Sequence, residues 1–213
     1  MLYRLASRVA ALAIVAAAAL TPGAARADIV FHTSPGAIQP KENILFNQAG
    51  LVSSGNPVQG VTNQTGQIVT LLGNENLVTP SAGQARVEGA DGAFTSLMIS
   101  LADPAYSFTE LEFNVNLLSD ATITLNVLEP NGQMSNAVFS GDKAGENYFG
   151  IQAINGQRIQ SVTITAAAYS IQDVRQIRVG GVAIPEPGTY ALMATGLLPL
   201  AGAALRRRRT GTR

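Results

Sequence analysis

The chain has no cysteine and no tryptophan, and its 213 residues include a single histidine, His32. Without cysteine it can form neither a disulfide framework nor a thiolate metal site, so its stability must come from a packed core. A Cys–His pair is excluded, and any Ser-His-Asp set would have to use His32, which we expect to be an exposed edge-strand residue. The missing tryptophan also removes the usual aromatic platform of a sugar-binding face.

Charged residues are few, at 13% of the chain, and the formal net charge of zero hides an asymmetry. Residues 28–183 contain six Lys and Arg against thirteen Asp and Glu, which gives this segment a net charge of −7. An acidic domain repels phosphate backbones, so we expect no nucleic-acid partner.

Long hydrophobic runs are confined to the two ends of the chain. Residues 189–205 form an uncharged apolar run of 17 residues that is followed by Arg206, Arg207, Arg208 and Arg209. As a helix this run spans roughly 25 Å, slightly less than a bilayer core. A buried C-terminal helix is the alternative, but four arginines would not follow a fully buried segment. We therefore predict a transmembrane helix whose basic stop stays in the cytoplasm.

The N-terminus has the pattern of a secretory signal peptide. Two arginines lie among the first eight residues, an apolar run covers residues 9–20, and Ala25 and Ala27 occupy the positions that signal peptidase reads. A retained anchor helix is the alternative, but the run is short and Pro22 ends it. We expect signal peptidase to cleave between Ala27 and Asp28.

A short motif, Pro185-Glu186-Pro187, stands directly before the predicted membrane helix. Together with the helix, the arginine cluster and the signal peptide, it resembles the sorting tail of PEP-CTERM proteins. The resemblance implies recognition by exosortase, transient anchoring in the inner membrane, and processing of the tail on the way to the cell surface or an exopolysaccharide biofilm matrix. It divides the chain into a signal peptide (1–27), a domain (28–183) and a sorting tail (184–213).

The middle segment alternates polar and apolar residues in the manner of β-strands. The alternation is clearest in residues 110–117, 122–127, 149–153 and 161–165, and further strands are predicted at 44–46, 67–72, 85–88, 95–101 and 176–179. No segment between the export signals shows helical periodicity. We predict an all-β domain, an antiparallel β-sandwich that is jelly-roll-like, with an immunoglobulin-type sandwich as the alternative.

The strand phase predicts which side chains form the core. The predicted inward set is Leu111, Phe113, Val115, Ile123, Leu125, Val127, Phe149, Ile151, Val162, Ile164, Ile177 and Val179. Asn155-Gly156 is the strongest turn signal and predicts a hairpin between residues 148–154 and 158–166. Residues 33–67 are rich in Gly, Asn, Pro, Ser and Gln and are expected to form mainly long surface loops.

Candidate catalytic and metal-binding groups are sparse. Glu110 and Glu112 share one strand face, where a glycosidase could place its carboxylates, but we interpret them as a solvated face. We expect no cofactor and interpret the loop aspartates mainly as turn residues, with a structural calcium of undefined ligand set as the alternative: these are Asp91, Asp103, Asp120, Asp142 and Asp173. Two Thr-x-Thr pairs, at 122–124 and 163–165, are interpreted as outward strand residues rather than an ice-binding array.

Three classes of function remain open from the sequence. The first is a non-catalytic structural or adhesive protein of the cell surface or matrix, associated with exopolysaccharide. The second is a carbohydrate-binding module, for which Tyr106, Tyr148 and Tyr169 are the available aromatic residues. The third, a secreted hydrolase, lacks a catalytic constellation. The fold alone does not decide between them.

Overall fold

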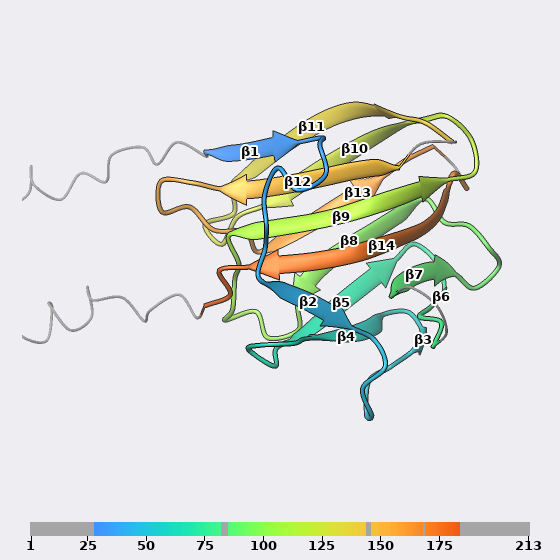
Figure 1. Ribbon diagram of the computed structural model, residues 1–213, viewed down its shortest axis with the longest axis horizontal. Coiled ribbons are helices and arrows are strands. Elements are labelled where there is room, and N and C mark those ends of the chain that lie inside the picture. Colours follow the sequence, from blue (N-terminus) through green and yellow to red (C-terminus); the bar gives the residue numbers. More distant parts are fainter. Residues whose placement is uncertain (1–27, 82–84, 144–145, 168, 184–213) are drawn as a thin grey trace, which may run out of the picture.

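The computed structural model describes residues 28–183 except 82–84, 144–145 and 168. The predicted signal peptide, sorting motif, membrane helix and arginine cluster lie outside these residues. Within the described ranges the chain forms fourteen strands and no helix, so they hold no helix long and apolar enough to cross a membrane (Figure 1). The strands are arranged as a two-layer antiparallel β-sandwich, which confirms the predicted fold class.

The front sheet is nearest the viewer in Figure 1 and has the order β1-β12-β9-β14. These strands are β1 (Ile29–His32), β12 (Asn147–Ala153), β9 (Glu110–Leu117) and β14 (Ile171–Gly180). The free side of β14 pairs with β7 (Arg86–Gly89) along one half and with β2 (Glu42–Leu45) along the other. Two short strands, β6 (Leu77–Val78) and β3 (Ser54–Gly55), extend the sheet beyond β7.

The back sheet has the order β4-β5-β8-β13-β10-β11. Its strands are β4 (Val58–Thr62), β5 (Ile68–Gly73), β8 (Ser96–Leu101), β13 (Ser161–Thr165), β10 (Ala121–Leu128) and β11 (Met134–Gly141). The two sheets are joined on one side by β2, which pairs with both β14 and β4. On the other side β1 and β11 lie at the two ends of the strand order, where Phe31 contacts Phe139 at a ring-centroid distance of 6.3 Å.

The core lies between the two sheets, and all twelve residues predicted to point inward are buried in it. Phe113 of β9 is directly opposite Phe149 of β12, and Phe149 also packs against Phe139 of the back sheet at 5.3 Å. Period-two patterning therefore predicted the strand phase correctly, because each strand has one face in the core. The main core cluster runs from Ile44 to Val179 and so lies within the segment 28–183.

One local prediction was wrong. Asn155-Gly156 does form a turn, with φ of 53° and 80°, but it joins β12 of the front sheet to β13 of the back sheet, and these strands do not pair. Most of the segment 33–67 lies outside strands, as predicted, although it also contributes β2, β3 and β4. Gly60 in β4 has no side chain, and a Cβ there would lie 2.4 Å from Ile44 Cγ2, so the glycine is required for packing on β2.

Candidate functional site

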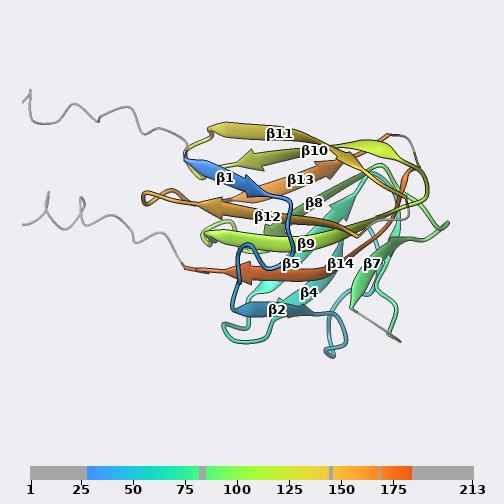
Figure 2. The ribbon, with the colours of Figure 1, turned by 45° about the horizontal axis from the view of Figure 1, so that its top comes forward.

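The first and last described residues lie at the same end of the sandwich, which we call the terminal pole. It consists of Asp28, the turn at residues 154–158, Ser107 and residues 181–183. The Ile154 amide donates to the carbonyl of Asp28 at 3.0 Å, and the Asn155 side chain donates to Asp28 Oδ2 at 2.6 Å. Figure 2 shows that β1 begins and β14 ends at this same end.

Arg158 ties the end of β14 to the rest of the terminal pole. Its Nη2 donates to the carbonyls of Ser107 and Gly181, each at 2.6 Å, while Ser107 and Ala183 exchange two backbone hydrogen bonds. Burial lowers the pKa of Arg158, but the guanidinium remains charged because its ordinary value is so high. The last described residue, Ala183, is thus held to the domain directly before the predicted sorting motif.

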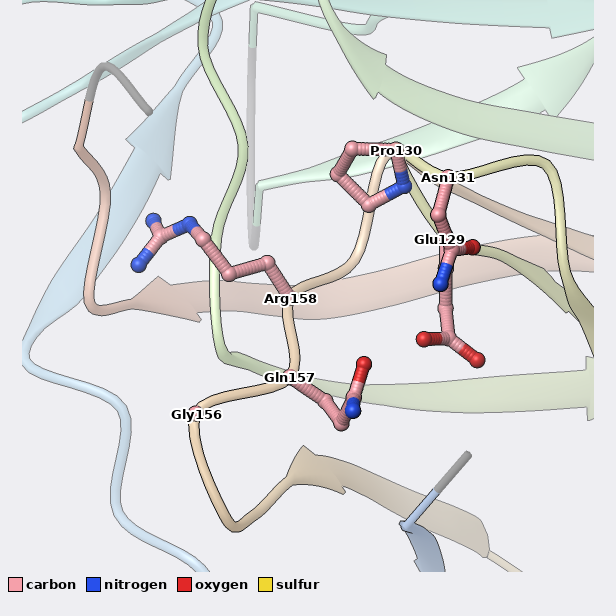
Figure 3. A pocket seen from close by; sticks show the side chains of 6 residues that line it. All are labelled: Glu129, Pro130, Asn131, Gly156, Gln157 and Arg158. Carbon is pink, nitrogen blue, oxygen red and sulfur yellow. The ribbon is translucent and has the colours of Figure 1, made fainter. Parts of the chain in front are cut away.

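A pocket of about 180 Å³ lies at the terminal pole between the end of β10 and the turn after β12 (Figure 3). Glu129 and Gln157 point into the space between them, whereas the guanidinium of Arg158 points away. Glu129 is 1% exposed, and neither of its carboxylate oxygens has a hydrogen-bond partner among the described residues. Burial raises the pKa of the Glu129 carboxyl, and the nearby Asn131 side chain acts in the opposite direction. The Asn131 amide forms its own hydrogen bonds with Gln133, so it does not serve as a partner of Glu129.

The outer face of the front sheet is polar and partly covered. The segment joining β1 to β2, residues 33–41, crosses this face (Figure 1) and is called the strap. Ile38 of the strap is buried above Gly150, where a Cβ would lie 2.9 Å from Ile38 Cγ1. Glu112, opposite Gly150 on β9, is 8% exposed, with its Oε1 4.0 Å from Arg178 Nη1. The expectation of a solvated Glu112 is therefore wrong, because alternation alone does not foresee the strap.

Unpaired amides lie on the same face beside Tyr148. Asn114 of β9 is opposite Tyr148 on β12 and Arg175 on β14, and both polar atoms of its buried amide lack partners. Gln176 has φ of 55° at a register shift in β14, and its Oε1 is also buried without a partner. The hydrogen bond from the Tyr148 hydroxyl to Glu146 raises the pKa of Tyr148. The amides of Asn114 and Gln176 act in the opposite direction, although neither forms a hydrogen bond with the hydroxyl.

The outer face of the back sheet differs from the front in that it carries no charge. None of its six strands contains a charged residue, although the segment 28–183 has a net charge of −7. The two predicted Thr-x-Thr pairs lie on this face side by side, with Thr124 of β10 opposite Thr165 of β13. The interpretation of these threonines as outward strand residues agrees with their exposed and half-buried positions.

The back sheet ends in an edge strand without protection. β11 pairs with β10 in a continuous register over eight residues, and no described strand pairs with its other side. Its sequence has no charge, proline or register shift, which are the usual devices that prevent edge strands from pairing with other chains. Val138 and Met134 are 60% and 68% exposed on its outer side.

The remaining predicted candidates do not converge. His32 lies on the edge strand β1 as expected, but it is half-buried with Nε2 unpaired rather than exposed. Tyr106 packs against the core and Tyr169 is exposed after β13, so neither joins Tyr148 in a platform. Among the described residues, no three His, Asp or Glu side chains gather closely enough to hold a metal, and the aspartates proposed for calcium are dispersed.

Comparison with known proteins identifies the tail. The sequence profile of the PEP-CTERM protein-sorting motif matches residues 183–209. The chain therefore carries the sorting signal of PEP-CTERM proteins, which marks it as an exported protein processed by exosortase. No curated protein sequence matches the chain. Among solved structures, the family 11 carbohydrate-binding module of Clostridium thermocellum is similar at a TM-score of 0.33 and 15% identity, covering 68% of this chain and 98% of that one.

Proposed function

We propose that this exported protein is a non-catalytic structural component of the cell surface or biofilm matrix, and that the back sheet is its assembly surface. The observation that carries the proposal is the uncharged back sheet ending in the unprotected edge of β11. Charged side chains on that surface would lose their hydration on association, and like charges from a domain of net charge −7 would repel. A neutral face with a free row of backbone donors and acceptors avoids both costs.

A single lysine tests this proposal. Val138→Lys places a charge at the centre of the β11 edge, and Val52→Lys is the matched control because Val52 is an exposed loop residue at 44%. Sedimentation and light scattering across a concentration series should show self-association of the parent and the Val52→Lys protein, and its loss in Val138→Lys. A parent protein that stays monomeric at every concentration, or a Val138→Lys protein that associates normally, would contradict the proposal.

Polysaccharide binding by the front sheet is the second candidate. Supporting it are the unpaired amide of Asn114 and the unpaired Oε1 of Gln176 beside a tyrosine ring, since sugar hydroxyls both donate and accept hydrogen bonds. Affinity electrophoresis in exopolysaccharide from the producing cells should show retardation that Tyr148→Ala removes and Tyr169→Ala retains. Equal retardation of all three proteins, or none, would exclude this face as the site.

That the domain is not an enzyme remains part of the proposal. Its support is the sequence, in which one histidine and no cysteine leave few routes to a catalytic pair. A broad screen of glycoside, ester and peptide substrates with the purified domain should detect no turnover. Any activity that survives repurification and is lost on a point substitution in the domain would overturn this part.

The role of the tail in delivery is tested separately. Because proline restricts its own φ and favours extended geometry in the residue before it, the sequence Pro185-Glu186-Pro187 predicts that Glu186 is presented on a stiff peptide. Glu186→Ala should leave the domain folded but block processing, so that uncut protein accumulates in the membrane. Fractionation and mass on a gel follow both properties, and normal tail removal in Glu186→Ala would show that this glutamate is not required.

A further inference from the structure

The pocket at the terminal pole contains a carboxylate that the described chain leaves without a partner. Glu129 continues the inward phase of Leu125 and Val127 along β10, so its side chain enters the end of the sandwich rather than solvent. A buried carboxylate without a hydrogen-bond donor is costly, and the raised pKa of Glu129 agrees with its burial. A cationic donor that fits a pocket of about 180 Å³ would remove this cost.

Among the residues that the structure describes, Arg158 is the only cationic side chain that lines this pocket, and its guanidinium binds other groups. Its Nη2 donates to the carbonyls of Ser107 and Gly181, and no ion pair joins it to Glu129. Turning the guanidinium toward Glu129 would leave those two carbonyls without their donor. No other cationic side chain of the described residues lines the pocket, so the geometry leaves room there for a cation from elsewhere.

Signal peptidase would create such a group at the same place. The turn at residues 154–158 holds Asp28 through its backbone carbonyl and its carboxylate, and Gly156 and Gln157 of that turn line the Glu129 pocket. Water hydrolyses the bond between residues 27 and 28, leaving a carboxylate on Ala27 and an amine on Asp28 that takes up a proton. An α-amino group has a pKa of about 7.7–8.0, so it is largely charged at neutral pH.

We propose that the Glu129 pocket is a binding site for a primary ammonium group and that its occupant is the α-ammonium of Asp28, formed by signal-peptide cleavage. Before cleavage the Asp28 nitrogen is a neutral amide with one hydrogen; afterwards it carries a positive charge and three donors. The existing hydrogen bonds from Ile154 and Asn155 already hold Asp28 against the turn whose next two residues line the pocket, so little ordering remains to be done. The inference goes beyond the assembly function and rests on the predicted cleavage after Ala27.

Four versions of the segment 28–183 test the site. One pair begins at Asp28 and the other carries Gly-Ser before it, and each pair is made with Glu129 and with Glu129→Gln. Thermal unfolding at pH 7 should show the protein that begins at Asp28 to be more stable than its extended form by on the order of 5 °C. Glu129→Gln should remove that difference, lowering the melting temperature of the Asp28 form and leaving that of the extended form equal or higher.

The proposal would be overturned if Glu129→Gln changed the melting temperature equally in the Asp28 form and in the extended form. It would also be overturned if these two forms, both with Glu129, had the same melting temperature. A second measurement needs no variant: NMR titration of the Asp28 α-amine should give a pKa above its usual range, whereas an ordinary value would overturn it. N-terminal sequencing of the exported protein should begin at Asp28, and another first residue would exclude this occupant. None of these outcomes depends on whether β11 mediates assembly.

Discussion

Replacing Phe113 by alanine tests the core at one of its largest fully buried side chains. Phe113 is fully buried in the middle of β9, and its ring lies 5.7 Å from that of Phe149. Because β9 is hydrogen-bonded to β12 on one side and β14 on the other, the backbone cannot move into the space that the ring leaves. We expect a loss of about 3–5 kcal/mol, near the top of that range because about 1 kcal/mol of ring pairing is also lost.

Urea denaturation of the segment 28–183 measures this loss. The midpoint should fall while the slope stays constant, and the melting temperature should drop by on the order of 10 °C for a domain of this size. Val52→Ala is the control, since truncation at an exposed loop position should change stability by less than about 0.5 kcal/mol. A loss below about 1.5 kcal/mol for Phe113→Ala would refute the argument that the flanking strands prevent collapse.

Three further variants test single features. Gly89→Ala places a Cβ 2.4 Å from the backbone oxygen of Ala93, so we expect a loss of roughly 1–3 kcal/mol in urea denaturation, and none would mean that this turn adapts freely. Arg158→Met removes the donor to the Gly181 carbonyl and should speed hydrogen exchange at the end of β14; unchanged exchange would refute the anchoring role. In the uncleaved chain the pKa of Glu129 is raised, so the folded state binds the carboxyl proton more tightly than the unfolded state does. The free energy of unfolding should therefore decline as pH rises above about 4.3, the ordinary pKa of a glutamate. Glu129→Gln should remove that part of the decline, which pH-dependent urea denaturation measures.

The sequence predicted the centre of the fold well because those strands have one buried face. β9 and β13 have the predicted ends, and the inward set includes Ile177, which follows the irregular Gln176. In such strands the period-two pattern is a direct consequence of the fold, so it can be read without knowing the partner strands. β11 was missed because its inward residues include Ser135 and Ala137, which give only a weak alternation.

Pairing was harder to predict than strand positions. Asn155-Gly156 specifies a turn with two positive φ values, and that local property is satisfied equally by a hairpin and by a link between two sheets. What decides between them is the partner of each strand: β12 lies between β1 and β9, while β13 lies between β8 and β10. That choice depends on contacts far apart in the sequence, which no local turn signal contains.

The candidate sites were predicted least. Glu129 follows Ile123, Leu125 and Val127 at intervals of two, and a carboxylate in the inward phase of a strand is a signal that the sequence does contain. The burial of Glu112 had no such signal, because it depends on where the strap crosses the sheet. The neutral back face was also hidden, since the acidic net charge belongs to the whole segment and only the strand order separates the two faces.

The terminal pole also constrains when the edge of β11 can pair. β10 ends at the pole, where Glu129 meets the turn after β12, so β11 begins there and runs away from it. Antiparallel pairing of two β11 edges therefore points the two poles in opposite directions. Two copies that are both held to one membrane by tails leaving from Ala183 would have their poles on the same side, and only the weaker parallel pairing would be open to them.

If β11 mediates assembly, release of the tail should therefore permit it. Energy transfer between labelled copies should be low for the full-length protein reconstituted in one vesicle population and should rise for the tail-free segment 28–183 at the same mean concentration. Val138→Lys should abolish the rise, and Val52→Lys should leave it intact. Strong transfer between tethered copies that Val138→Lys removes would show instead that the edges pair in parallel before release.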